Sequence, residues 1–201
     1  EIVYKYDNKV VAIDMPKIDP NKPLPQIHSR EIVAQSKLFR VERLDLEFSN
    51  GATREFERMA GGNRGAVMIV PMLDENTMVL IREYAAGTHS YQLGFPKGLI
   101  DPGETAIEAA NRELQEEAGF AANDLVELHK VSMAPTFFNA NMTIVLARDL
   151  YPKQLEGDEP EPLEVIHWPL DEADALLARE DFVEARCIAA LFLAQKWFKE
   201  Q

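Results

Sequence analysis

The stretch GLIDPGETAIEAANRELQEEAGF, residues 98–120, predicts a helix with a defined start and a defined end. Thr105 and Glu108 are spaced as a capping box, in which each side chain satisfies a free backbone amide at the start of a helix. Gly119 favours the left-handed backbone conformation with which many helices end. We therefore expect a helix over residues 105–118. One of its faces is apolar and should pack against a sheet through Ile107, Ala110, Leu114 and Ala118.

Three glutamates crowd the end of this helix. Glu113 and Glu117 are four residues apart and Glu116 lies beside them, so like charges meet where the helix dipole also disfavours anions. A compensating cation is therefore expected, and carboxylates are preferred ligands of Mg²⁺. Arg112 lies four residues before Glu116 and can hold that carboxylate in place by a salt bridge. We predict that Glu113, Glu116 and Glu117 bind a divalent metal; the alternative is an acidic helix face that meets only solvent.

Residues 95–98, FPKG, are expected to form a tight loop before the helix. Its backbone carbonyls, including that of Lys97, can reach the same metal, because main-chain oxygens also bind hard cations. Gly98 has no side chain and would let the loop pass close to the glutamates. We therefore add Lys97 to the predicted metal site.

The stretch resembles the signature of the Nudix hydrolase family: Gly, five residues, Glu, seven residues, then Arg-Glu-apolar-x-Glu-Glu-x-Gly-apolar. Every position is filled, by Gly98, Glu104, Arg112, Glu113, Leu114, Glu116, Glu117, Gly119 and Phe120. Pro135 lies sixteen residues after Gly119, and a proline at that offset marks the ADP-ribose pyrophosphatase branch of the family. The resemblance to this branch extends over residues 30–200, whereas residues 1–27 show none.

This resemblance implies an α/β protein with the Nudix fold, an αβα sandwich with a mixed sheet, here preceded by a small N-terminal β-stranded segment. It implies a homodimer with the N-terminal strands at the interface. It also implies Mg²⁺, Mn²⁺ or another divalent cation as cofactor. The expected substrates have the form ADP-X, namely ADP-ribose, diadenosine di- and triphosphates and NADH. Hydrolysis of their pyrophosphate bond releases AMP.

In this branch of the family the general base comes from a loop well after the signature stretch. The matching loop is residues 156–161, EGDEPE, and we expect Glu159 to be the base. Glu161 is expected to bind metal or to replace Glu159 as the base. Arg112 completes the catalytic group because it orients Glu116. A solvated acidic loop without a catalytic role is the alternative.

Arginine side chains are suited to bind the substrate phosphates, because the guanidinium forms paired hydrogen bonds with them. The candidates precede the signature stretch: Arg54, Arg58 and Arg82. Exposed strand charges are the alternative for each of them. Many ADP-ribose hydrolases carry an arginine where this chain has Ala85, and the difference favours a broader range of ADP-X substrates. Phe137 and Phe138 are expected either to stack on adenine or to lie in the core.

Apolar patterns elsewhere predict strands over residues 39–48, 53–59, 66–73, 77–81, 125–133, 142–147 and 165–168, and helices over residues 171–178 and 183–199. Asn50-Gly51 predicts a hairpin turn, and residues 74–76 predict a second one. We divide the chain into an extension of unknown role (residues 1–29), a β-hairpin region with dimer contacts (residues 30–62) and the Nudix hydrolase domain (residues 63–201).

The formal net charge of −13 argues against sequence-independent binding to nucleic acid or to an anionic membrane surface, because both need Lys and Arg. No apolar run reaches membrane-spanning length. The single cysteine, Cys187, is expected to pack in the core, as are Trp168 and Trp197. Sparse cysteine fits a reducing compartment, so the cytoplasm is the expected location.

Two other functions stay open at this point. A Nudix hydrolase of another branch would act on nucleoside triphosphates or sugar nucleotides, although Pro135 and residues 150–162 argue against it. A Nudix-like binding module would sense ADP-ribose without cleaving it. Loss of the signature glutamates is the usual route to such a module, and none of them is lost here.

Overall fold

The structure is a computed structural model that describes residues 2–6, 9–13, 18–60 and 64–201. The boundary predicted at residues 62–63 lies outside the described residues. No helix among them is long and apolar enough to cross a membrane.

The part of the chain that contains the signature stretch is built around two sheets. The first has the strand order β10-β11-β6-β9, and the second has the order β12-β7-β8. The strands are β6 (Ala66–Pro71), β7 (Thr77–Ala85), β8 (Ser90–Gly94), β9 (Lys97–Leu99), β10 (Phe120–Ser132), β11 (Asn141–Pro152) and β12 (Glu164–Pro169). β11 and β6 are parallel, whereas the other pairs in these two sheets are antiparallel, as expected for a mixed sheet.

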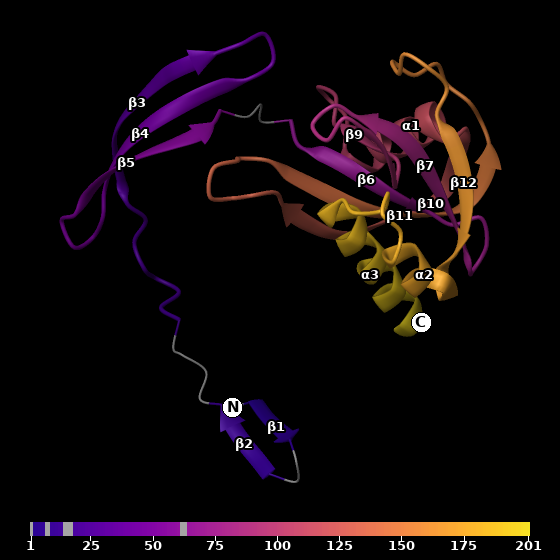
Figure 1. Cartoon of the computed structure of the whole chain (residues 1–201), viewed down its shortest axis with the longest axis horizontal. Helices are drawn as coiled ribbons and strands as arrows, with labels where there is room; N and C mark the ends of the chain where they lie inside the picture. The colour runs from indigo at the N-terminus through magenta and orange to yellow at the C-terminus, as the bar shows by residue number, and fades with distance from the viewer. Residues whose placement is uncertain (1, 7–8, 14–17, 61–63) are drawn as a thin grey trace.

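Helices cover both faces of these sheets, as Figure 1 shows. The helix α1 (Ala106–Glu117) lies on one face, and α2 (Ala173–Leu177) and α3 (Ala185–Lys199) lie on the other, with the short 3-10 helix η1 (Leu170–Glu172) before α2. Side chains alternate along β6, so Val67 packs on the α1 side and Met68 on the α2 and α3 side. The predicted αβα sandwich is therefore confirmed.

The N-terminal strands form sheets of their own. β3 (Gln26–Gln35), β4 (Arg40–Glu47) and β5 (Thr53–Met59) make an antiparallel sheet beside the sandwich (Figure 1), and β1 (Ile2–Tyr6) pairs with β2 (Lys9–Ile13). β4 and β5 are the predicted hairpin, and Gly51 in its turn has a φ of +79°. The sequence pattern does not predict β3. The Met59 N–H donates to the Phe137 carbonyl at 2.8 Å and joins this sheet to the sandwich.

The second predicted hairpin is wrong. β6 and β7 are consecutive, but they belong to different sheets, and only Met72 and Met78 form a bridge beside the turn. The Asp74 side chain accepts hydrogen bonds from the backbone N–H groups of Asn76 and Thr77, at 2.8 and 2.7 Å, and so turns the chain from one sheet to the other. Strands that are buried on both faces show no alternation of apolar and polar residues that would identify their partners.

Other predicted elements need smaller corrections. The helix α1 is one residue shorter at each end than predicted, because Thr105 is its N-cap and Ala118 its C-cap. The predicted helix over residues 171–178 is divided between η1 and α2, and the last helix begins two residues later than predicted. β10 and β11 are longer than predicted, and β8 was not predicted. The predicted loop over residues 95–98 is wrong in part, because β9 begins at Lys97 and pairs with β6.

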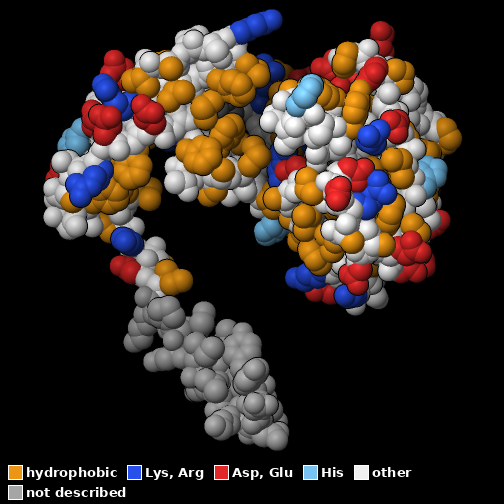
Figure 2. Space-filling model, viewed as in Figure 1, with side chains coloured by type: hydrophobic (Ala, Val, Ile, Leu, Met, Phe, Trp, Pro, Cys, Tyr) orange, Lys and Arg blue, Asp and Glu red, His pale blue; other side chains and the backbone are white. Residues whose placement is uncertain are grey.

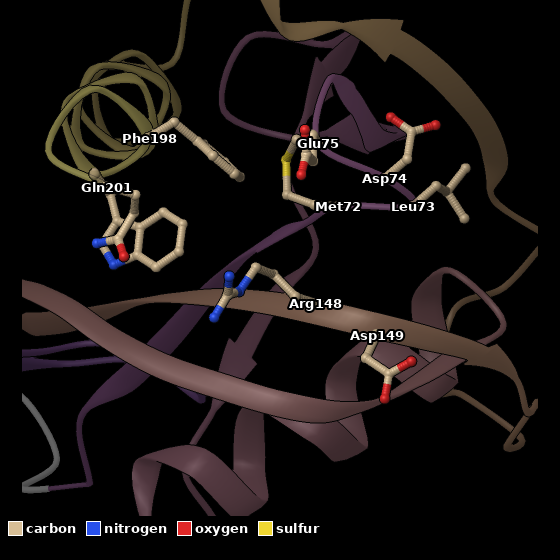
Figure 3. Close-up of a pocket in the computed structure, with 9 residues that line it drawn as sticks. Met72, Leu73, Asp74, Glu75, Arg148, Asp149, Phe198 and Gln201 are labelled. Atoms are coloured by element: carbon tan, nitrogen blue, oxygen red, sulfur yellow. The ribbon is translucent and has the colours of Figure 1, made fainter.

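Cys187 belongs to the buried core, and Trp168 and Trp197 are partly buried and pack against that core, as predicted. A cavity of about 510 Å³ lies next to Trp197 and is also lined by Met72 and Arg148 (Figure 3). None of the predicted catalytic, metal or substrate residues is among those that line this cavity, so the predicted site lies elsewhere.

Candidate active site

The glutamates of the signature stretch are carried by α1. The Thr105 hydroxyl accepts a hydrogen bond from the Glu108 N–H (3.2 Å), and the Glu108 carboxylate accepts one from the Thr105 N–H (2.8 Å), so the capping box is complete. Gly119, after the helix, has a φ of +75°. Ala110 and Leu114 are fully buried against the sheets. This packing determines where the acidic last turn of α1 lies.

Arg112 joins the acidic residues of α1 to the chain before it. Its Nε donates to Glu104 Oε1 (2.8 Å), and its Nη1 donates to Glu113 Oε1 (2.7 Å) and to Glu116 Oε2 (2.9 Å). Its Nη2 donates to the Leu99 carbonyl (2.9 Å). The expected contact with Glu116 is present, and those with Glu104 and Glu113 were not expected. Arg112 therefore positions three carboxylates at once.

Strand β9 passes close to Glu113. A Cβ on Gly98 would lie 2.1 Å from the carboxyl carbon of Glu113, so only glycine fits here without moving that side chain. Glu113 is 9% exposed, and this burial raises the pKa of its carboxyl. The close approach expected at Gly98 is present.

Gly98→Ala is expected to lower kcat by roughly tenfold or more, because small misplacements of catalytic groups are costly, while the protein still folds. The new methyl group would displace the Glu113 carboxylate, which is the end of a flexible side chain, rather than backbone. Steady-state kinetics and a thermal melt measure the two effects. Gly87→Ala is the matched control, because nothing lies within 4 Å of a Cβ there. Equal rates for the two variants would mean that the position of Glu113 does not matter to the reaction.

Glu117 lies in a second group of charges, with Lys97 and Glu83. Its Oε2 accepts a hydrogen bond from the Lys97 N–H (2.7 Å), and Lys97 Nζ forms an ion pair with Glu83. Burial, together with the charges of Glu83 and Glu113, raises the pKa of Glu117 to about 8. The Lys97 ammonium is a cation and cannot bind a metal itself. Its backbone carbonyl stays the predicted ligand.

Glu83 belongs to this group, but the sequence patterns did not indicate it. It follows the apolar part of β7, and its neighbours Arg82 and Tyr84 point to the opposite face of the strand. The only local sign of its role in the sequence is that a charged residue closely follows a buried apolar run. Its partner Lys97 is fourteen residues further along the chain.

The loop between β11 and β12 brings Glu159 to these charges. Partial desolvation of its carboxyl raises the pKa of Glu159, the carboxylates of Glu83 and Asp158 raise it further, and Lys97 lowers it. Asp158 also raises the pKa of Glu113. The predicted base is therefore within electrostatic reach of Glu83 and Lys97, and its neighbour Asp158 is within reach of α1.

Glu161, the alternative base, has a different partner. Its Oε1 accepts a hydrogen bond from the Tyr91 O–H at 2.5 Å. Arg82 forms an ion pair with Glu164 (2.9 Å) at the same end of the loop. A cavity of about 280 Å³ is lined by Arg82, Glu159 and Glu161 among others. Of the three predicted substrate arginines, Arg82 is the one beside the predicted base.

The other two predicted substrate arginines lie on β5 in the N-terminal sheet. Arg54 donates to the carbonyl of the preceding residue (2.7 Å), and Arg58 forms an ion pair with Glu42 (2.7 Å). Arg58 lines a cavity together with Phe137, which is 52% exposed and so does not lie in the core. Within one chain, the three arginines line separate cavities.

The donor set suits a hard divalent cation. The carboxylates of Glu113, Glu116 and Glu117, with those of Glu83 and Glu159, outnumber the cations Arg112 and Lys97, and such oxygen ligands bind Mg²⁺. Among the described residues, no three acidic, histidine or cysteine side chains converge on one point. Arg112 and the Lys97 N–H hold the carboxylates of α1 instead. The residues therefore fit a metal by their chemistry, and their roles as ligands stay a prediction.

Comparison with known proteins identifies the class. The chain matches the model of the NUDIX domain over residues 62–191 and the model of the NudE-type Nudix hydrolase N-terminal domain over residues 25–58. The protein therefore belongs to the Nudix family and is a Nudix hydrolase, as the signature stretch indicated.

The chain is also similar to individual proteins of this family. The chain is 60% identical to the ADP compounds hydrolase NudE of Escherichia coli (strain K12) over 177 residues, which cover 88% of this chain and 95% of that protein. The crystal structure of an ADP compounds hydrolase has 58% sequence identity and a TM-score of 0.86, and the match covers 91% of this chain and 98% of the other. The ADP-sugar pyrophosphatase of Mus musculus is 29% identical, over 88% of this chain and 89% of that protein.

Proposed function

We propose that this Nudix hydrolase splits the pyrophosphate bond of ADP-X compounds and releases AMP, with a divalent metal as cofactor. The substrate class comprises ADP-ribose, diadenosine di- and triphosphates and NADH. Mg²⁺ held by Glu113, Glu116 and Glu117 would supply positive charge to the pyrophosphate and lower the pKa of a bound water.

The protein's own groups have separate roles in this proposal. Glu159 accepts the proton of the water that attacks phosphorus. Arg82 binds a substrate phosphate, for which it must exchange its ion pair with Glu164. Arg112 keeps Glu113 and Glu116 in position.

One observation carries the proposal: the loop of Glu159 lies against the acidic last turn of α1, where Gln154 Nε2 donates to the Glu116 carbonyl and the Leu155 N–H donates to the Gln115 carbonyl, although loop and helix are far apart in sequence. A metal site with a carboxylate base beside it can catalyse hydrolysis of a pyrophosphate. The 60% identity to the Escherichia coli ADP compounds hydrolase supports ADP-X compounds as its substrates.

A kinetic screen tests the proposal. It compares ADP-ribose, NADH, diadenosine polyphosphates, a nucleoside triphosphate and a sugar nucleotide, each with Mg²⁺ and with EDTA. We expect AMP from the ADP-X compounds with Mg²⁺ only. A preference for the nucleoside triphosphate or the sugar nucleotide would assign the protein to another branch. Binding of ADP-ribose without turnover would identify a sensing module.

Divalent metal is expected to raise the melting temperature. The carboxylates of Glu113, Glu116 and Glu117 repel one another, and a ligand that binds only the folded state stabilises it. Thermal melts in EDTA, Mg²⁺ and Mn²⁺ measure the shift. NaCl of equal ionic strength, without any divalent cation, is the control for charge screening by salt. The absence of a shift in millimolar Mg²⁺ or Mn²⁺ would count against the metal site.

We also propose a homodimer through the N-terminal sheet. Figure 2 shows hydrophobic side chains gathered over this part of the chain, where Ile32, Phe39 and Phe56 are 45%, 52% and 42% exposed. Exposed apolar patches often mark contacts between proteins. Arg54 and Arg58 lie on the same sheet, and within one chain they line cavities separate from that of Arg82. Their predicted contact with substrate therefore depends on the dimer. Light scattering coupled to gel filtration measures the mass.

The division of the chain at residues 29–30 and 62–63 and the cytoplasmic location stay predictions. The separate hydrogen bonding of the β3-β4-β5 sheet supports a division between β5 and β6, whereas the boundary at residues 29–30 falls inside β3.

A further inference from the structure

The loop that carries Glu159 is tied to α1 at its upstream end. Gln154 Nε2 donates to the Glu116 carbonyl (3.0 Å), and the Leu155 N–H donates to the Gln115 carbonyl (3.2 Å). Both acceptors belong to the acidic last turn of the helix. The loop therefore starts at a defined place beside the predicted metal ligands.

Burial does not hold the middle of the loop, because residues 155–162 are all exposed. Hydrogen bonds must therefore determine where Glu159 lies. The Tyr91 O–H donates to Glu161 Oε1 at 2.5 Å, two residues after Glu159. The next contact, between Arg82 and Glu164, comes three residues later, where β12 begins.

Tyr91 is itself held in place on β8. The guanidinium of Arg82 lies 5.0 Å from the centroid of its ring, and the Tyr84 ring meets it edge to face at 5.8 Å. Contacts of both kinds are attractive, and a ring held by two neighbours loses little freedom when its hydroxyl donates. The Tyr91 hydroxyl is therefore a well-placed donor for the loop.

We propose that Tyr91 is a positioning residue for the reaction: by holding Glu161, it keeps the loop in the conformation that places Glu159 at the metal site. This proposal rests on the proposed function, in which Glu159 is the base. It gives Glu161 a different role from the one expected from the sequence, because its carboxylate acts as the acceptor that ties down the loop. A general base works only at a defined distance from the water it deprotonates.

Tyr91→Phe removes the hydroxyl and keeps the ring. We expect kcat to fall roughly tenfold and KM to stay within about twofold, because the tether affects the geometry of the base rather than the affinity for substrate. Hydrogen exchange of the backbone amides of residues 155–163 should become faster. Tyr84→Phe is the matched control, since the Tyr84 hydroxyl contacts His89 (2.8 Å) and not the loop. Unchanged kcat and unchanged exchange in Tyr91→Phe would overturn the proposal.

Two substitutions of Glu161 separate a tether from a base. Glutamine keeps an oxygen that can accept the Tyr91 hydrogen bond, whereas alanine does not. We therefore expect Glu161→Ala to resemble Tyr91→Phe and Glu161→Gln to recover most of the lost rate. If Glu161→Gln is as slow as Glu161→Ala, the charge of Glu161 matters in its own right and the tether is wrong.

A double-mutant cycle tests whether Tyr91 acts through Glu159. If it does, adding Tyr91→Phe to Glu159→Gln lowers kcat no further. If the two losses multiply, Tyr91 acts independently of Glu159 and the positioning role is wrong. A normal rate for Glu159→Gln alone would overturn the base assignment and the positioning role with it. A slow Glu159→Gln beside a normal Tyr91→Phe would overturn the positioning role alone.

Discussion

Glu117→Gln is expected to lower kcat by about three orders of magnitude or more, because it removes a metal-binding charge that is needed in the transition state. The protein should remain as stable as before. Glu117 is a buried carboxylate with a raised pKa, so its charge is costly to bury, and the neutral amide removes this cost. The amide oxygen can still accept the hydrogen bond from the Lys97 N–H.

Steady-state kinetics at saturating Mg²⁺ and a thermal melt in EDTA measure these two effects. Glu108→Gln is the matched control on the same helix, because glutamine also completes a capping box. Activity of Glu117→Gln within tenfold of the unmodified protein would refute the metal-ligand assignment. A large drop in melting temperature would show that the loss of activity reflects folding.

Glu159→Gln is expected to reduce kcat by roughly 10²–10⁴-fold, the usual contribution of a positioned base. KM should change little, because the base acts mainly in the transition state. The structure supports this choice, since the carboxylates of Glu83 and Asp158 and partial burial raise the pKa of Glu159. A base with a pKa closer to neutral is better matched to the pH at which it works.

Glu156→Gln, at the exposed start of the same loop, is the control for Glu159→Gln, and both are measured at one metal concentration. If Glu161→Gln is the slow variant and Glu159→Gln is near normal, the roles of the two residues are exchanged. If both are near normal, the base lies elsewhere, and Glu116 becomes the leading candidate.

Local patterns were enough to predict α1 and its acidic end. The contacts that start, support and end a helix join residues at most four positions apart, so the capping box at Thr105 and the glycine at position 119 are visible in the sequence. The same is true of the β4–β5 hairpin, whose turn is encoded by Asn50-Gly51. The family followed from the signature stretch, because its spacing specifies many residue types at once.

Pairing between distant strands was not predictable in the same way. The apolar runs of β6 and β7 are consecutive and look like a hairpin, but β6 pairs with β11 and β9. A run that is buried on both faces has no polar side to mark its orientation or its neighbours. The hairpin was wrongly predicted because both faces of these strands are apolar.

The sequence alone therefore determined the helix, the acids it carries and the family. Only the tertiary structure decided which other charges meet those acids. Glu83 and Lys97 come from different strands, and Tyr91 reaches Glu161 across seventy positions. Such contacts depend on how sheets and loops pack, and the packing energy is shared among many residues with no local spacing rule. For this reason the sequence led to the glutamates of α1 and the loop of Glu159, whereas the charges and the tyrosine beside them became visible only in the fold.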